Sequence, residues 1–262
     1  MVRMNLAARR FSSLLRADLE PLHWLGTTPT LDLADDRLRM RAQALTQLAG
    51  SDRERALALY QYVKAIKLGF PTRLRYPTAR QILDSHSANN YCKSTLLVAF
   101  LRLVKIPARI RMVRLRGDIL QGLYNGLPWV NYSLVEVWLH QRWVKTDSYT
   151  CDSAYLGTAR HLLEKAGWER GYCIVRQGAA QWDGEHDALA ALSIDEGEHL
   201  PLIDFGVFND PLEFISNHSE GAGTQAYGAV RGLHFRVVAG LMHRQIRKLR
   251  QEPMPAQWAL KG

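Results

Sequence analysis

The sequence has few cysteines, no long apolar run and no metal-ligand spacing, and each shortage excludes a class of protein. The three cysteines, Cys92, Cys151 and Cys173, are too few and too scattered for a disulfide framework or a structural zinc site. No run approaches the roughly 18 apolar residues that span a bilayer, and the N-terminus lacks the continuous apolar stretch that is typical of a secretory signal. We therefore predict a cytoplasmic protein without a metal or organic cofactor, since a phosphate-binding glycine loop is also missing.

Basic residues exceed acidic ones, but they are spread along the chain. The formal net charge is +9, from 34 Lys and Arg against 25 Asp and Glu, in 262 residues. The one dense basic cluster comprises Arg244, Arg247, Lys248 and Arg250. Positive charge is favourable near the C-terminus of a helix, so a solvated helix end explains this cluster, with contact to a membrane surface or nucleic acid as the alternative. The basic residues within 1–17 fit a first helix or a transit peptide, and composition leaves both open.

Apolar periodicity predicts helices in the first part of the chain. One is expected around residues 6–15 and a second over 35–49. Ser51 and Glu54 form a capping-box pattern that opens a third helix running to about Leu68. The clearest helix covers 93–105, with apolar residues on one face at Leu96, Leu97, Phe100, Leu101 and Val104.

The pattern changes to strands after Pro107. Strands are predicted at 110–113, 133–139 and 142–146, and the last two are joined by a two-residue hairpin turn. From 151 to 215 only a short helix at 156–166 is expected, within irregular connections. A linker at 219–224 and a helix at about 226–250 complete the chain. The predicted division is an N-terminal helical region (1–68), a core (69–215) and a C-terminal basic helix (226–250).

Cys92 is the first candidate for chemistry because it lies at the start of the strongest helix. Helix N-terminal amides and the macrodipole favour a thiolate, and the amides can bind an oxyanion. A buried structural cysteine is the alternative. The segment from Tyr91 to Arg109 reads YCKSTLLVAFLRLVKIPAR. It resembles the transglutaminase-like superfamily, where a cysteine opens a helix that ends in a Gly-Ile-Pro-Ala-Arg-like turn, and here Lys105 replaces the glycine.

A second motif supports this resemblance and departs from it at one position. The family has a strand of the form His-x-x-Val-Glu-Val-aromatic-Leu, then Trp-Val and an aspartate. Here the corresponding residues are Tyr132 to Leu139, Trp143-Val144 and Asp147, so Tyr132 occupies the histidine position. Counting back from the hairpin turn puts Asp147 opposite Leu134, which makes Tyr132 its diagonal neighbour on the same face. A phenol with a pKa near 10 is a poor general base at neutral pH.

Other histidines are candidates for the missing base. His86 lies in the polar loop that leads to Cys92, although a solvated loop histidine is the plainer interpretation. His140 lies eight residues along the strand from Tyr132, about 27 Å away at strand rise, which is too far. His186, His199 and His218 fall in regions whose placement the sequence does not predict.

The resemblance implies an α+β transglutaminase-like core of the papain type, with N-terminal helices, a central helix carrying Cys92 on an antiparallel sheet, and a C-terminal helix. It also implies cysteine-dependent acyl transfer on amides: hydrolysis, transamidation or amide formation. In that reading Cys92 is the nucleophile, its amide helps to bind the oxyanion, Asp147 orients a partner and Tyr132 hydrogen-bonds in place of the base. Expected partners are a peptide, a protein or a small amide or acyl substrate. The alternatives are a pseudoenzyme that binds peptides or proteins, and an adaptor that acts through its basic helix.

Overall fold

The computed structural model of the protein describes residues 21–70, 76–192, 201–218 and 225–252, and side chains from 237 onward in the last range. The helix expected around 6–15 and the linker at 219–224 lie outside these residues.

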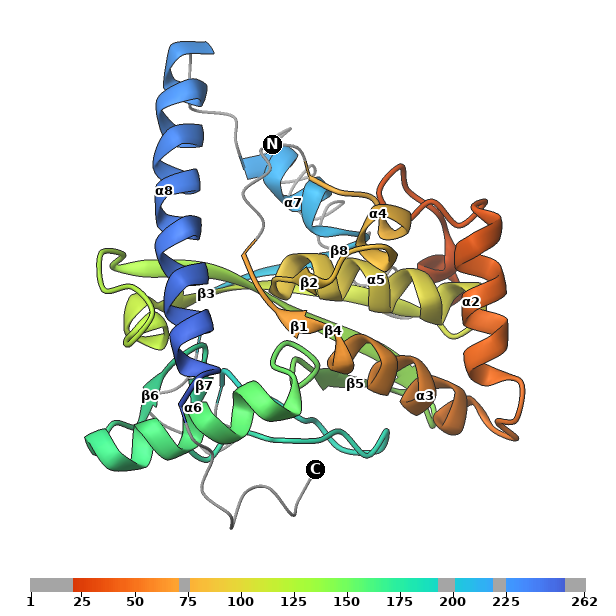
Figure 1. The fold of residues 1–262 in the computed structure, drawn as a ribbon. Coiled ribbons are helices and arrows are strands. Elements are labelled where there is room, and N and C mark those ends of the chain that lie inside the picture. Colours follow the sequence, from red (N-terminus) through yellow and green to blue (C-terminus); the bar gives the residue numbers. More distant parts are fainter. Residues whose placement is uncertain (1–20, 71–75, 193–200, 219–224, 253–262) are drawn as a thin grey trace, which may run out of the picture.

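A four-stranded antiparallel sheet forms the centre of the molecule (Figure 1). Its order is β5 (Arg142–Thr146), β4 (Trp129–Leu139), β3 (Ala108–Arg116) and β8 (Ile203–Phe208). The first three are the predicted strands, with β3 and β4 longer than expected. His140 and Gln141 both have positive φ, at 51° and 61°, as a two-residue hairpin turn requires, and Leu139 pairs with Arg142 as predicted.

The segment from 151 to 215 contains more regular structure than the predicted short helix and irregular connections. Besides α6 (Ser153–Ala166), it includes β6 (Arg170–Gly171), β7 (Ile174–Val175), β8 and α7 (Pro211–His218). Strand β8 pairs with β3, and the register shifts between Met112 and Val113. Gly206, at φ 89°, lies within β8 opposite this irregularity and interrupts the apolar alternation, which is why the strand was missed.

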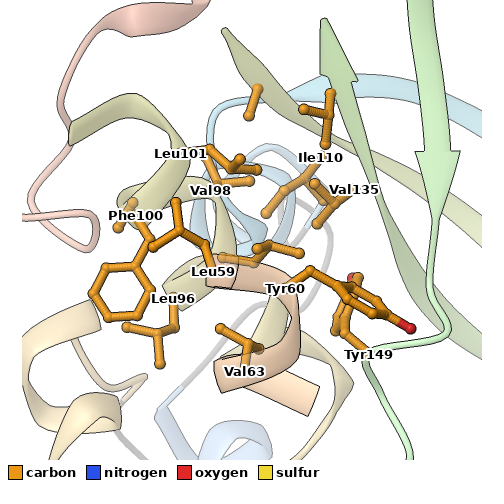
Figure 2. Packing of buried hydrophobic residues seen from close by; sticks show 14 of the residues in the cluster. Leu59, Tyr60, Val63, Leu96, Val98, Phe100, Leu101, Ile110, Val135 and Tyr149 are labelled. Carbon is orange, nitrogen blue, oxygen red and sulfur yellow. The ribbon is translucent and has the colours of Figure 1, made fainter. Parts of the chain in front are cut away.

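Helices α2 (Asp36–Thr46), α3 (Asp52–Ala65) and α5 (Asn90–Leu103) share the main hydrophobic core with one face of the sheet (Figure 2). The core face of the sheet carries Ile110 and Val135, and α5 covers it with its apolar stripe. All three helices were predicted, with somewhat different ends. The close-up shows members from each layer: Leu59, Tyr60, Val63, Leu96, Val98, Phe100 and Leu101 from the helices, and Ile110 and Val135 from the strands.

The ends of α3 and α5 depend on a helix cap, a short strand pair and one left-handed residue. Ser51 accepts the N–H of Glu54, while the Glu54 carboxylate binds the N–H of Gly50, so the cap differs slightly from the predicted box. Helix α3 stops at Ala65, earlier than the predicted Leu68, because Lys67–Leu68 forms β1 and pairs with β2 (Ser87–Ala88). After α5, Lys105 adopts φ 66°, the left-handed conformation that favours glycine.

A second hydrophobic cluster lies on the other side of the sheet. It joins η2 (Gly117–Leu120), α6 and α8 (Gln225–Leu249), which is the predicted C-terminal helix. The remaining elements are η1 (Pro21–Leu25) and α4 (Ala79–Leu83). Of the α8 side chains from 237 onward, which the structure describes, five are buried: Val238, Ala239, Met242, Ile246 and Leu249. None of the helices within the described ranges combines the length and the apolar character needed to cross a bilayer.

Candidate functional site

Cys92 lies within the first turn of α5, because this helix begins at Asn90 rather than at residue 93. Asn89 is the N-cap, and its Oδ1 accepts the N–H of Cys92 at 3.0 Å. The amide that was expected to help bind an oxyanion is therefore already engaged in the helix cap. In this conformation only the Cys92 thiol is available to the site, because its N–H donates to the N-cap of the helix.

The Cys92 thiol is protonated at neutral pH. The side chain is buried, and this burial raises the pKa of the thiol from 9.0 to about 12, although the interaction with Asn89 lowers it somewhat. Removing the thiol from water penalises the thiolate more than the helix N-terminus favours it. The dipole alone therefore does not produce the reactive thiolate that the sequence pattern indicates.

Tyr132 and Asp147 lie together, as the hairpin count predicted. Tyr132 is buried on β4, and its hydroxyl donates to Thr150 Oγ1 at 3.1 Å. Burial, and next the negative charge of Asp147, raise the pKa of Tyr132 well above its usual value. The phenol therefore stays protonated and can donate a hydrogen bond, but it cannot accept a proton from the thiol as a histidine would.

Asp147 follows directly after β5 and is fully buried. Its carboxylate accepts the N–H of Ala191 at 3.0 Å and that of Ala190. Burial raises the pKa of Asp147 from 3.8 to about 6, against the lowering effect of the two amides and of Tyr132. The carboxylate thus binds a backbone segment, in the place where the family pattern would have it orient an imidazole.

Asn90 connects the start of α5 to the sheet and to the loop after β5, and the sequence analysis missed it. Its Nδ2 donates to Ser133 O at 2.9 Å and to Thr150 Oγ1 at 3.0 Å. Its Oδ1 accepts the N–H of Ser133 at 2.8 Å. Asn90 and Thr150 are each within three residues of a residue that the motifs single out, which is the signal that could have found them.

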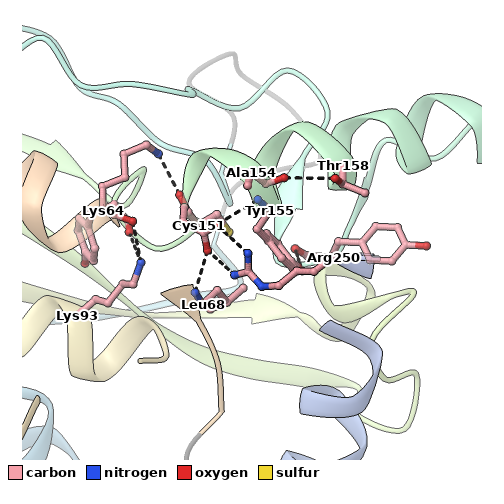
Figure 3. A network of polar contacts seen from close by, with 11 residues as sticks. Lys64, Leu68, Lys93, Cys151, Ala154, Tyr155, Thr158 and Arg250 are labelled. Carbon is pink, nitrogen blue, oxygen red and sulfur yellow. Dashed lines mark hydrogen bonds and ion pairs between the residues drawn. The ribbon is translucent and has the colours of Figure 1, made fainter. Parts of the chain in front are cut away.

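Two buried lysines hold the loop from Asp147 to Asp152 in place (Figure 3). Lys64 Nζ donates to Ser148 O at 2.6 Å and to Cys151 O at 3.0 Å. Lys93 Nζ donates to Tyr149 O at 3.0 Å and to Lys64 O at 3.2 Å. Burial lowers the pKa of Lys93 to about 7. Fully buried lysines are rare, so their burial here could not be predicted from the residue type.

A cavity of about 1300 Å³ lies beside these residues, and Asn90, Cys92, Tyr132 and Thr150 all line it. His86 also lines it, and it is the one histidine among the lining residues that the structure describes. The structure thus brings Cys92 and Tyr132 to one cavity, with Asp147 next to Tyr132.

The other candidate histidines lie elsewhere. His140 is exposed at the hairpin turn, and His186 pairs with Asp183 at 2.7 Å. His218 packs against Phe214 at the end of α7, and His199 is outside the described residues. Within the described ranges, no group of three or more His, Cys, Asp or Glu side chains could hold a metal ion.

A cysteine-bearing helix packed on an antiparallel sheet, with the loop after β5 beside the helix start, defines an α+β fold of the papain type. Residues 39–148 match the family model of the transglutaminase-like superfamily, so this segment is a transglutaminase-like core. The match includes Cys92, Tyr132 and Asp147.

Among solved structures, a candidate cysteine protease from Cytophaga hutchinsonii is similar, at 14% identity and a TM-score of 0.38. The alignment covers 47% of this chain and 39% of that protein, and such a low score carries no argument about function. The search of curated proteins finds no match.

Proposed function

We propose that the transglutaminase-like core is a binding cleft whose Cys92 thiol stays protonated, so that the protein is a pseudoenzyme. The observation that carries this proposal is Tyr132 in the histidine position, buried and donating to Thr150. A general base must accept a proton near the working pH, and a phenol with a raised pKa does not. The cavity beside it is the expected site of the bound molecule.

Two further features support a binding role. The pKa of Cys92, about 12 because of burial, leaves almost no thiolate at pH 7. The Asp147 carboxylate accepts the amides of Ala190 and Ala191 and so stabilises a loop. Each of the three motif residues therefore contributes to folding or to the cavity wall without needing a catalytic role.

Alkylation of Cys92 with iodoacetamide, followed by mass spectrometry of the Cys92 peptide at each pH, tests this proposal. We expect slow modification at pH 6 to 7 and a rate that rises with pH beyond an ordinary thiol pKa of about 8.5. Cys92→Ser provides the control that assigns the modified peptide. Rapid modification below pH 6, lost in His86→Ala, would defeat the proposal, because a Cys–His ion pair holds the thiolate even in mild acid.

Cysteine-dependent acyl transfer on amides remains the second candidate. It is favoured by Cys92 and Tyr132 lining one cavity, with Asp147 adjoining Tyr132. Cys92 would be the nucleophile, Tyr132 a hydrogen-bond donor and Asp147 its positioning residue. An acylated Cys92 peptide, trapped from an amide or ester substrate and absent in Cys92→Ser, is the observation that would favour this candidate over the pseudoenzyme.

A further inference from the structure

One wall of the cavity is apolar and is formed by residues of a single hydrophobic cluster. Eight of its lining residues belong to the cluster on the far side of the sheet, and six of these have pure hydrocarbon side chains: Leu68, Phe70, Ile119, Leu120, Leu127 and Val130. They come from the end of β1, from η2 and from the entry to β4. Because they share one cluster, they offer a continuous apolar surface to a bound molecule.

The entrance of the cavity also carries apolar surface that faces water. Trp129 is 44% exposed and Ile215 is 38% exposed, and both line the cavity. Exposed large apolar side chains next to a cavity mark a place where burial by a ligand lowers the free energy. The cavity, at about 1300 Å³, is larger than the roughly 300–1,000 Å³ of typical small-molecule sites. It therefore has room for a long apolar group.

A small polar part of the wall contains one hydroxyl hydrogen that is available to a ligand. Thr150 Oγ1 accepts from Asn90 Nδ2 at 3.0 Å and from Tyr132 at 3.1 Å. A hydroxyl oxygen has two lone pairs, so both acceptor positions of Thr150 are filled and its own hydrogen is left to donate. Since Thr150 lines the cavity, a ligand carbonyl oxygen is the partner that suits this hydrogen.

We infer that the cavity binds a long-chain acyl compound with an uncharged amide or ester head, whose carbonyl oxygen accepts from Thr150 and whose chain lies along the apolar wall. This inference names the ligand class of the proposed binding function and rests on it. An uncharged head fits because no Lys or Arg occurs among the described lining residues. The lining carboxylate, Asp84, is compensated by its ion pair with Arg80, so it does not call for a cationic head either.

Calorimetric titration with butanamide, hexanamide and octanamide tests the chain preference. Each methylene buried along the wall should tighten binding about fourfold, so octanamide should bind roughly two hundredfold more tightly than butanamide. Octanoate, with the same chain and a negative head, should bind more weakly than octanamide. Equal affinity across the series, or tighter binding of octanoate, would overturn the inference.

Two pairs of variants locate the ligand. Val130→Trp replaces a small side chain of the apolar wall with a bulky indole ring that fills part of the cavity, so it should abolish the chain-length dependence. Ile203→Trp adds the same ring at an exposed position on β8 outside the cavity and should preserve this dependence. Thr150→Ser keeps the hydroxyl and should retain octanamide affinity, whereas Thr150→Val should lose about tenfold. If Val130→Trp keeps the full dependence while remaining folded, the chain binds elsewhere and the inference fails.

Ammonia release during the same titrations separates this inference from the proposed function. Chain-length-dependent binding without ammonia supports both. Chain-length-dependent binding with ammonia release that is lost in Cys92→Ser would retain the acyl ligand and reject the pseudoenzyme. Absence of the chain-length dependence, with Cys92 still inert, would reject the acyl ligand alone.

Discussion

Arg250, directly after α8, forms an ion pair with Asp152, the N-cap of α6, with Nη1 at 2.9 Å from Oδ1. Asp152 Oδ2 also accepts the N–H of Leu68 at 2.9 Å (Figure 3). One carboxylate therefore ties together the start of α6, the end of α8 and β1. Burial alone raises the pKa of Asp152, but the contacts with Arg250 and with the amides of Leu68 and Tyr155 lower it overall.

The first prediction concerns this ion pair. Arg250→Ala leaves a largely buried carboxylate without its cation, and we expect the free energy of unfolding at pH 7 to fall by about 1–3 kcal/mol. Because the lowered pKa of Asp152 stabilises the fold only above the unfolded pKa near 3.9, the difference from wild type should shrink as pH falls towards 3. Urea unfolding measures both effects. Truncation after Glu252 keeps Arg250 and should leave stability unchanged, and an equal loss there would contradict the role given to the ion pair.

The second prediction follows from the raised pKa of Asp147, about 6 against 3.8. A carboxyl with a raised pKa contributes stability below its unfolded pKa, and this contribution is lost as pH rises through 6, by about 3 kcal/mol in total. Asp147→Asn cannot ionise, so its deficit relative to wild type should narrow between pH 4 and pH 8. The measurement is urea unfolding across this range. For the control Asp36→Asn, at an exposed position, the difference in free energy of unfolding from wild type should stay constant across this range. A constant deficit for Asp147→Asn would contradict the raised pKa of Asp147.

The third prediction uses the opposite sign at Lys93, whose pKa is lowered from 10.5 to about 7. A base with a lowered pKa contributes stability above its unfolded pKa, and the contribution is lost as pH falls towards 7. Relative to Lys93→Met, wild type should gain about 3 kcal/mol between pH 7 and 9.5. Lys165→Met, at an exposed position on α6, should show no such change relative to wild type. Parallel curves for wild type and Lys93→Met would show that Lys93 does not titrate in this window.

The sequence predicted local pairing well and buried polar contacts poorly. The register of β4 and β5 followed from the turn at His140 and Gln141, because a two-residue hairpin fixes which residues face each other. Strand β8 was missed because Gly206 interrupts its apolar alternation, and its pairing with β3, about 90 residues away in the chain, adds no local pattern that could have revealed it. The division into three regions stays a prediction.

In the candidate site, too, residues within local motifs could be predicted, whereas residues whose partners are distant in the sequence could not. Cys92, Tyr132 and Asp147 were predicted as site residues by motif and by strand geometry, and that assignment stays a prediction. Asn90 and Lys93 were not, because their roles depend on carbonyls and hydroxyls of the distant loop after β5, which become partners only in the folded chain. Composition marks such residues as surface-prone, and only packing shows that they are buried.

The last prediction restores a base at the position where the family pattern has one. In Tyr132→His, the imidazole would lie next to Asp147, which can hold it as an imidazolium, and this charge favours the Cys92 thiolate. We expect the alkylation midpoint of Cys92 to move to lower pH by about two units or more. Tyr132→Phe removes the hydroxyl without adding a base, so its profile should keep the wild-type midpoint.

A double variant shows whether the shift depends on the carboxylate. Adding Asp147→Asn to Tyr132→His should reverse most of the shift, because an uncharged amide does not stabilise the imidazolium. Circular dichroism verifies that each variant is folded before alkylation is measured. A Tyr132→His protein that is folded and reacts with the wild-type profile would mean that position 132 does not face the thiol, and the correspondence between Tyr132 and the family histidine would then be wrong.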